Sequence, residues 1–305
     1  MPADRPPQAF IRKETETMDL TEVFNRTRPC FSLEIFPPKD HQGGVETIYE
    51  TLDGLREVRP EFISCTYGAG GNLADSSTIE ICSIIKEKYG ILPISHLTCV
   101  NNSKENINVI MDSLKEKGIT NILALRGDLK PGQQPEKDFS HASDLISYIK
   151  ERDPAFFISA ACYPEGHPDS GDLITDVLDL KKKVDCGAGH LISQLFFNNE
   201  DFYRFRDRCE LAGINVPIEA GIMPVTSKQS ILRMVSMCGA SIPSKLAKIL
   251  NRFEDKPKAL EEACIAYAID QMIDLISNEV DGIHLYTMNK PYIAQRIFQV
   301  IDSMR

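Results

Sequence analysis

The sequence TNILALRGD, residues 120–128, has the pattern of a buried β-strand that ends in charged and small residues. Its apolar and β-branched residues are typical of a strand in a parallel sheet. Arg126, Gly127 and Asp128 then follow at the point where the strand should end. One ending of this kind could be a surface turn. Several other strand-like segments of this chain end in or carry polar residues too, and this recurrence predicts both the fold and the place of the site.

Strand-like and helix-like segments alternate along the whole chain. The pattern predicts strands over residues 30–36, 61–67, 92–100, 120–126, 156–163, 190–197, 215–222 and 281–287. It predicts helices over residues 44–58, 74–88, 103–117, 140–151, 172–186, 199–211, 227–238 and 290–304, with two further helices inserted over 242–279. Most repeats are about 30 residues long, which is the size of a βα unit.

Eight βα units favour a closed parallel (β/α)8 TIM barrel over an open doubly wound sheet. The open fold often carries a glycine-rich dinucleotide fingerprint after its first strand. Here the first predicted strand is followed by PPKDHQGG instead. We therefore predict an α/β barrel with extra helices inserted before the last strand. Residues 1–29 are expected to form an N-terminal tail and lead-in helix, and residues 30–305 a single catalytic domain.

Composition limits the classes of partner. The formal charge of the 305 residues is -10, which argues against a general nucleic-acid-binding surface. Nine scattered cysteines without a C-x-x-C pair are typical of reduced cytosolic thiols, and the histidines lack the spacing of metal ligands. The sequence shows neither a signal peptide nor an apolar run long enough for a membrane span. We expect a cytoplasmic protein with no metal, nucleic-acid or membrane partner.

Polar residues recur where the predicted strands end, which is where a (β/α)8 barrel builds its active site. They include Glu34, Thr66, His96, Arg126, Gly127, Asp128, Tyr163, His167, Gln194 and Glu219. Each has a structural explanation when taken alone. Glu34 could form an ion pair with Arg126, His96 could be a core histidine, and Gln194 could be a satisfied core amide. Because unsatisfied buried polar groups are costly, so many at one end of a barrel predict a site for a large, flat, polar ligand.

A charged stripe is predicted on the fifth helix. Asp176, Asp179 and Lys183 lie at positions i, i+3 and i+7, and therefore along one face. The stripe could be a solvated surface. Alternatively it faces a ligand, with an aspartate binding ribose hydroxyls and Lys183 binding a phosphate.

Several motifs, taken in order, resemble one known family. They are SLEIFPPK, SCTYGAGG, HLTCVNNS, ILALRGD, AACYPEGHP, LKKKVDCGAGHLISQLFFN, YRFRDRC and GIMPV. Any one of them is a weak signal. Together, from about residue 30 to residue 300, they make the chain similar to the methylenetetrahydrofolate reductases, flavin enzymes of one-carbon metabolism.

The resemblance implies a TIM barrel that holds a flavin noncovalently, normally FAD with FMN as the alternative. It implies reduction of 5,10-methylenetetrahydrofolate to 5-methyltetrahydrofolate, a step toward methionine, with NAD(P)H as donor. Glu34 falls on the family's general acid, Asp128 on the aspartate beside flavin and folate, and Gln194 on the residue that holds the pterin. The positions that fall on flavin contacts are Thr66, His96, Arg126, Gly127, Asp128, Tyr163, His167, Asp176 and Lys183.

Two departures from the family pattern leave the electron donor open. Some relatives carry an aromatic residue just after the GI-x-PV turn, where this chain has Thr226 and Ser227, and some have Asn where this chain has Asp179. The chain could be a complete NAD(P)H-dependent reductase. It could also be the flavin subunit of a complex fed by an iron–sulfur or ferredoxin-type protein.

A third alternative is a folate- or flavin-binding barrel without activity. The joint presence of Glu34, Asp128 and Gln194 argues against it. Because the chain ends after the predicted barrel, we expect no inhibition by S-adenosylmethionine. The family resemblance also implies a homo-oligomer or a subunit of a complex.

Overall fold

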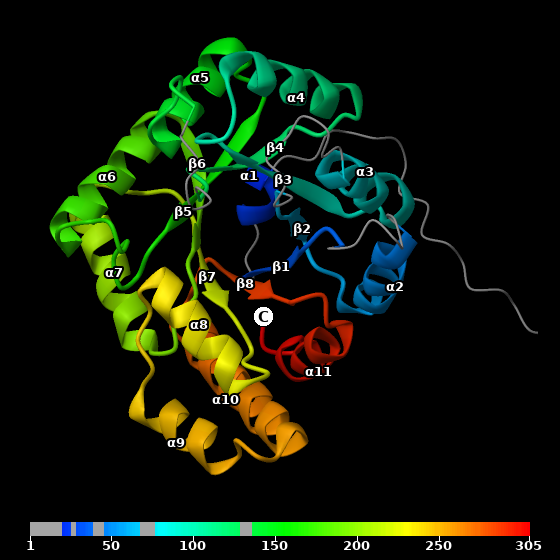
Figure 1. The fold of residues 1–305 in the computed structure, drawn as a ribbon, viewed down its shortest axis with the longest axis vertical. Helices are drawn as coiled ribbons and strands as arrows, with labels where there is room; N and C mark the ends of the chain where they lie inside the picture. The colour runs from blue at the N-terminus through cyan, green and yellow to red at the C-terminus, as the bar shows by residue number, and fades with distance from the viewer. Residues whose placement is uncertain (1–19, 26–28, 39–45, 68–76, 129–135) are drawn as a thin grey trace, which may run out of the picture.

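The computed structural model describes residues 20–25, 29–38, 46–67, 77–128 and 136–305. Eight parallel strands close into a barrel in which each strand pairs with the next and β8 pairs with β1 (Figure 1). The strands are β1 (Cys30–Ile35), β2 (Phe62–Cys65), β3 (Leu92–Thr98), β4 (Asn121–Leu125), β5 (Phe157–Cys162), β6 (Ala188–Ser193), β7 (Ile218–Ile222) and β8 (Gly282–Tyr286). The predicted (β/α)8 fold is confirmed.

Helices surround the barrel on its outside, except α1, which lies at one end of it (Figure 1). They are α1 (Leu20–Phe24), α2 (Glu46–Leu55), the 3-10 turn η1 (Arg56–Val58), α3 (Ser77–Tyr89), α4 (Lys104–Glu116), α5 (Ala142–Arg152), α6 (Leu173–Asp185), α7 (Asn199–Leu211), α8 (Lys228–Cys238), α9 (Ser244–Arg252), α10 (Pro257–Ser277) and α11 (Pro291–Ile301). Helices α9 and α10 are the predicted insertion before the last strand. The predicted starts of α2 and α3, at residues 44 and 74, lie outside the described residues.

The strand boundaries differ from the expectation most at the sixth strand. The sixth strand was expected over residues 190–197, but β6 spans Ala188–Ser193. The chain turns off after Ser193, where the Gln194 N–H still donates to the Cys162 carbonyl at 2.7 Å. Leu195, Phe196 and Phe197 are nevertheless buried, because they pack beneath helices instead of in the sheet. Their apolar character therefore reflects helix packing, which a strand pattern cannot distinguish.

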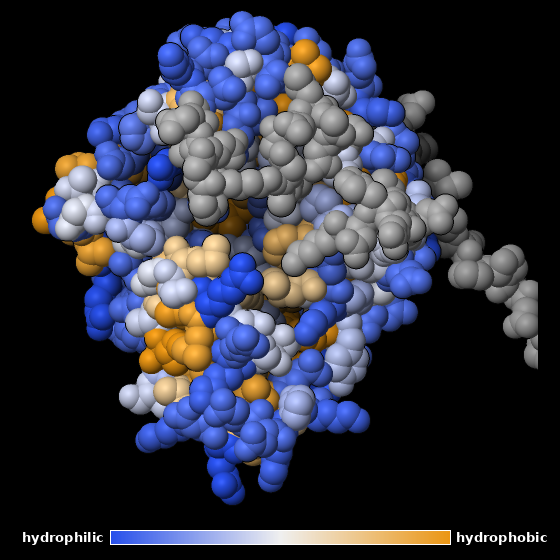
Figure 2. Space-filling model, in the orientation of Figure 1, coloured by the Kyte–Doolittle hydropathy of each residue, from blue (hydrophilic) through white to orange (hydrophobic). Residues whose placement is uncertain are grey.

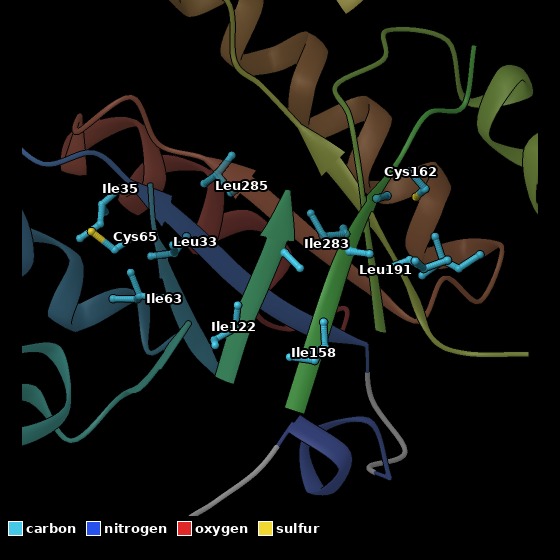
Figure 3. Packing of buried hydrophobic residues seen from close by; sticks show 14 of the residues in the cluster. Leu33, Ile35, Ile63, Cys65, Ile122, Ile158, Cys162, Leu191, Ile283 and Leu285 are labelled. Carbon is cyan, nitrogen blue, oxygen red and sulfur yellow. The ribbon is translucent and has the colours of Figure 1, made fainter. Parts of the chain in front are cut away.

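Alternation along each strand divides the core into two parts. Residues such as Leu33, Ile63 and Ile283 point outward and pack against the helices (Figure 3). The alternate residues point into the barrel, where one group is apolar and packs with α1. The strand residues of this group are Cys30, Phe62, Ile94, Leu123 and Ile192, and they pack with Leu20 and Val23 of α1. Helix α1 thus closes the end of the barrel where the strands begin (Figure 3).

Exposed apolar side chains gather on two helices. Leu173, Ile174 and Leu178 are exposed on α6, and Leu232 and Met237 on α8. Figure 2 shows these regions in orange on a face that is otherwise largely hydrophilic. No helix among the described residues has the length and apolar character needed to cross a membrane.

Gly221 on β7 lies where the backbone packs closely against the neighbouring strands β6 and β8. A Cβ atom at this position would lie 2.1 Å from the Ser193 carbonyl oxygen and 2.9 Å from the Tyr286 ring. Since strand backbone cannot move aside cheaply, we expect Gly221→Ala to destabilise the fold by about 3 kcal/mol in urea unfolding. Gly171→Ala is the control, because a Cβ there meets nothing within 4 Å. Equal stability of the two variants would contradict this account of the β6–β7–β8 contact.

Candidate active site

Glu34 lies inside the barrel near the carboxyl end of β1. Because Leu33 and Ile35 point outward, Ser32 and Glu34 share the inner face, with Ser32 one step deeper. Glu34 as a whole is 8% exposed. The same alternation places His96 of β3 and His284 of β8 inside the barrel, and both are buried.

Two imidazoles face this carboxyl group. Nε2 of His96 lies 3.5 Å from Oε2 of Glu34, and Nε2 of His284 lies 3.7 Å from the same oxygen. Arg126, the expected structural partner of Glu34, instead pairs with Asp169 at 2.8 Å. The interpretation of Glu34 as an ion-pair partner of Arg126 is therefore wrong. Its charge neighbours in the structure are histidines.

His96 is held uncharged at neutral pH. Burial lowers its pKa from 6.5 to about 4, and the charge of Glu34 opposes this shift only in part. Nε2 of His96 has no hydrogen-bond partner among the described residues. A buried ring nitrogen in this state is available to a ligand that enters the barrel.

Sequence reasoning missed two polar residues next to Glu34. Ser32 contacts Nδ1 of His284 at 2.6 Å, and Ser32 Oγ also donates to Glu219 at 2.9 Å. The period-two pattern of the strands was the available signal, because Ser32 precedes Glu34 by two residues. Similarly, His284 lies on the inner face of β8 between Gly282 and Tyr286.

A second group of predicted residues lies on the loops after β4 and β5 and on α6. Asp169 pairs with Arg126 and also donates its N–H to Nδ1 of His167 at 3.0 Å. The His167 N–H in turn donates to Asp176 Oδ1 at 3.1 Å. The structure therefore connects three of the predicted cofactor positions through one chain of hydrogen bonds.

Lys183 and Asp179, on α6, separate in the structure. Lys183 is half-buried and donates to the Ala161 carbonyl at 2.9 Å, and burial lowers its pKa. Burial also raises the pKa of Asp176. Asp179 is exposed and pairs with Lys182 at 2.6 Å. The charged stripe is thus divided: two members point inward, and Asp179 belongs to the surface.

Gly127 forms a narrow position next to β3. Its φ of +83° favours glycine, and a Cβ there would lie 2.8 Å from Thr98 Cβ. Oγ1 of Thr98 is buried and has no hydrogen-bond partner among the described residues. Only glycine therefore fits at residue 127, where the backbone packs directly against Thr98.

The other predicted residues surround the same strand ends. The ring of Tyr163 packs edge-on to His167 at 4.6 Å, and burial together with the charge of Asp128 raises the pKa of Tyr163 to about 12. Oε1 of Gln194 accepts the Leu195 N–H at 2.8 Å, which leaves its amide nitrogen for a ligand. Thr66 follows β2, and its carbonyl accepts a hydrogen bond from Thr78.

Among the described residues, two pockets lie at opposite ends of the barrel strands. Tyr163, Gly166 and Gln194 line a small one beside the carboxyl ends of β5 and β6. A larger one, of about 410 Å³, is lined by residues such as Arg206, Ile218 and Asp281, where β7 and β8 begin. The smaller pocket is the one that contains predicted site residues.

Comparison with known proteins decides the family. The family model for methylenetetrahydrofolate reductase matches residues 19–302. The chain belongs to the methylenetetrahydrofolate reductase family. Its predicted class, an oxidoreductase that acts on methylenetetrahydrofolate, is confirmed by this membership.

Curated members of the family span the chain at moderate identity. The 5,10-methylenetetrahydrofolate reductase of Escherichia coli is 37% identical over 288 residues, with 94% of both chains covered. That of Pectobacterium carotovorum is 35% identical, also with 94% of both covered. Methylenetetrahydrofolate reductase (NADH) 1 of Arabidopsis thaliana is 37% identical, but the chain spans only 48% of its length.

Solved structures share the fold at low sequence identity. An uncharacterised protein from Clostridium thermocellum that binds 5-methyl-5,6,7,8-tetrahydrofolic acid has a TM-score of 0.59 and 15% identity, with 92% of this chain and 99% of that chain covered. A dihydropteroate synthase from Coxiella burnetii has a TM-score of 0.52 and 12% identity, with 92% and 95% covered. These likenesses support the barrel architecture of this family member.

The buried His96 predicts a pH dependence of stability. Its pKa is about 4 in the folded protein and 6.5 when unperturbed, so between these values the unfolded chain binds more protons. The contribution of His96 is complete above about pH 7 and is lost as the pH falls to about 4, a change of up to about 3 kcal/mol. We expect His96→Asn to remove this part of the dependence in urea unfolding. The exposed His141→Asn should keep the wild-type dependence, and an identical profile for both variants would contradict the assignment.

Proposed function

We propose that this chain reduces 5,10-methylenetetrahydrofolate to 5-methyltetrahydrofolate with a bound flavin, and that Glu34 is the general acid. One observation supports the proposal above the others. Glu34 is a buried carboxyl group near the carboxyl end of β1, with two imidazoles within 4 Å of one of its oxygens. A proton donor in this position can act on a substrate in the mouth of the barrel.

The proton is needed because the methylene bridge must open before a hydride can add. One carbon–nitrogen bond breaks, and the leaving nitrogen takes the proton of Glu34. The other nitrogen and the carbon then form an iminium cation. When bound, the flavin supplies the hydride that this cation accepts. The uncharged His96 adds no positive charge beside Glu34, so it does not oppose formation of the cation.

Asp128 and Gln194 are proposed to position and stabilise the substrate. Asp128 is exposed at the end of β4, and a negative charge there favours a cation in the barrel mouth. Gln194 follows β6 and keeps its amide nitrogen free of hydrogen bonds within the described residues, so it can donate to the pterin. Both assignments follow the family pattern in the sequence.

The residues on the β4 and β5 loops fit a flavin. Gly127 lets the loop after β4 lie directly against Thr98, whose buried hydroxyl has no hydrogen-bond partner among the described residues. Arg126, Tyr163 and His167 follow β4 and β5, Thr66 follows β2, and His96 lies on β3 beside β4. Asp176 can bind ribose hydroxyls. Lys183 uses one N–H for Ala161 and retains others for a phosphate, which both FAD and FMN carry, whereas the ribose that Asp176 can bind is present only in FAD.

Glu34→Gln tests the proposed acid. The amide keeps the shape of the side chain but cannot protonate the leaving nitrogen, so folate reduction should fall by about 10²–10⁴-fold. Reduction of the flavin by its donor should persist, because that step needs no proton on the folate. Single-turnover absorbance of the flavin measures the two half-reactions separately. Glu57→Gln, an exposed position, is the control for the same chemical change.

Loss of both half-reactions together in Glu34→Gln would contradict the assigned role, since the variant would then have lost the flavin site or the fold. Retention of full folate reduction would also contradict it. Flavin content and urea stability of each variant separate these two cases.

A second candidate concerns the electron donor. The turn after β7 carries Thr226 and Ser227, and Ser227 caps α8 by accepting the Ser230 N–H at 3.1 Å. The aromatic residue found at this turn in some relatives is absent from the sequence. This favours a complex in which an iron–sulfur or ferredoxin-type protein supplies electrons instead of NAD(P)H.

Anaerobic spectra distinguish the two donors. If an electron-carrying protein is needed, 5-methyltetrahydrofolate should bleach the flavin absorbance and NADH should not. Rapid bleaching by both would instead indicate a complete NADH-dependent reductase. A protein that binds no flavin on reconstitution would contradict both versions.

A further inference from the structure

A chain of polar side chains continues from Glu34 into the interior of the barrel. Nε2 of His284 lies 3.7 Å from Glu34, and Nδ1 of His284 lies 2.6 Å from Ser32 Oγ. Ser32 Oγ donates to Oε1 of Glu219 at 2.9 Å. His284, Ser32 and Glu219 are each 0% exposed. The path therefore links the proposed acid to a carboxyl group that has no access to solvent.

The carboxyl group of Glu219 is ionised in this environment. Burial by itself would raise its pKa, but contact with His190, the charge of His284 and the Ser32 hydrogen bond together hold the pKa below its ordinary value. Nε2 of His190 lies 3.3 Å from Oε2 of Glu219, and Nδ1 of His190 contacts Ser159 Oγ at 2.9 Å. Glu219 is thus a fixed anion at the deep end of the path.

The hydrogen bonds then determine which nitrogen of His284 carries a proton. A serine hydroxyl has one proton to donate, and an ionised carboxylate can only accept. Ser32 must therefore give its proton to Glu219, and it can only accept from His284. It follows that Nδ1 of His284 is the protonated nitrogen, and that Nε2 is the nitrogen that faces Glu34.

We propose that Glu219 is a positioning residue for the proposed reaction: through Ser32 it fixes the proton of His284 on Nδ1, so that only Nε2 exchanges a proton with Glu34. The inference rests on the proposed role of Glu34. After Glu34 has given its proton to the substrate nitrogen, a proton that returns to the carboxylate from the His284 ring comes from Nε2, and Nδ1 keeps its own. Water at the barrel mouth replaces the proton that Nε2 has passed on.

Other groups around His284 are consistent with this role. His96 contacts the same oxygen of Glu34, but it is uncharged at neutral pH and so is a weak proton source. The Tyr286 ring packs edge-on to His284 at 5.2 Å, while its hydroxyl donates to the Ser193 carbonyl. Burial raises the pKa of Tyr286 well above its ordinary value. Among these described groups, His284 is the neighbour of Glu34 whose second nitrogen contacts a serine that donates to a carboxylate.

Nitrogen NMR of histidine-labelled protein tests the assignment directly. Six histidines are present, and the signals of His284 are identified by their loss in His284→Gln. We expect wild-type His284 to be protonated on Nδ1 whether its ring is neutral or charged. In Glu219→Gln the amide can donate to Ser32, so the neutral ring should shift toward protonation on Nε2. A wild-type ring protonated on Nε2, or a tautomer unchanged in Glu219→Gln, would overturn the proposal.

Controls separate positioning from stability. Ser159→Ala removes a contact of His190 but none of His284, so it should leave the His284 tautomer unchanged. Ser32→Ala should remove the tautomer preference of His284 with little change in side-chain volume. This variant replaces Glu219→Gln in the test if Glu219→Gln does not fold. If the His284 ring stays protonated on Nδ1 in Ser32→Ala, the Ser32 hydroxyl does not transmit the effect of Glu219, and the proposal is overturned.

Kinetics provide the second readout. Glu219→Gln should slow the folate half-reaction by about 10–100-fold, while flavin reduction by the donor stays within about twofold, because the change acts through the proton of Glu34. Equal slowing of both half-reactions would indicate general damage and overturn the proposal. Failure of the proposed function itself would show in Glu34→Gln, whereas the NMR result on His284 does not depend on activity.

Discussion

The period of two in a closed barrel is the constraint on which the rest of this structure depends. Every second residue of each strand points into a space that is sealed by α1 at one end, so a polar residue there meets protein instead of water. Ser32, Glu34, Glu219 and His284 all occupy such positions. Their charges and hydrogen bonds must therefore be matched inside the barrel, and the strands bring the matching groups from β1, β7 and β8 to successive depths, with Ser32 opposite His284 and Glu219 opposite Gly282.

A buried network of polar and ionised side chains makes the fold less stable than an apolar core of the same volume would, because each buried ionised group loses its hydration. The apolar layer around Phe62 and Leu123 shows that this barrel can be filled with hydrocarbon where no chemistry is needed. The polar residues instead form a connected set that reaches the carboxyl end of β1. A connected set that ends at a carboxyl group in the barrel mouth has a chemical use, and this supports a catalytic interpretation of Glu34.

The residues on the loops are held in a different way. Arg126, His167 and Asp176 are linked through Asp169 and through backbone N–H groups, with part of this network exposed. Such loops can adapt to a large ligand, while the strand residues beneath them stay fixed. The division agrees with a proton donor on a rigid strand and a cofactor cradle on the βα loops. The membership of the chain in the methylenetetrahydrofolate reductase family gives both parts a common purpose.

The sequence by itself determined the barrel, the insertion of α9 and α10, and the family. It also singled out the polar residues near the strand ends, such as Glu34, Arg126 and Lys183. It could do so because alternation, helix periodicity and ordered motifs are local properties of the chain. Only the tertiary structure decided that Glu34 faces His96 and His284 instead of Arg126, that Asp179 belongs to the surface, and that Ser32 connects His284 to Glu219. These contacts join strands that are distant in sequence, so their partners are set by barrel closure and register, which no local pattern encodes.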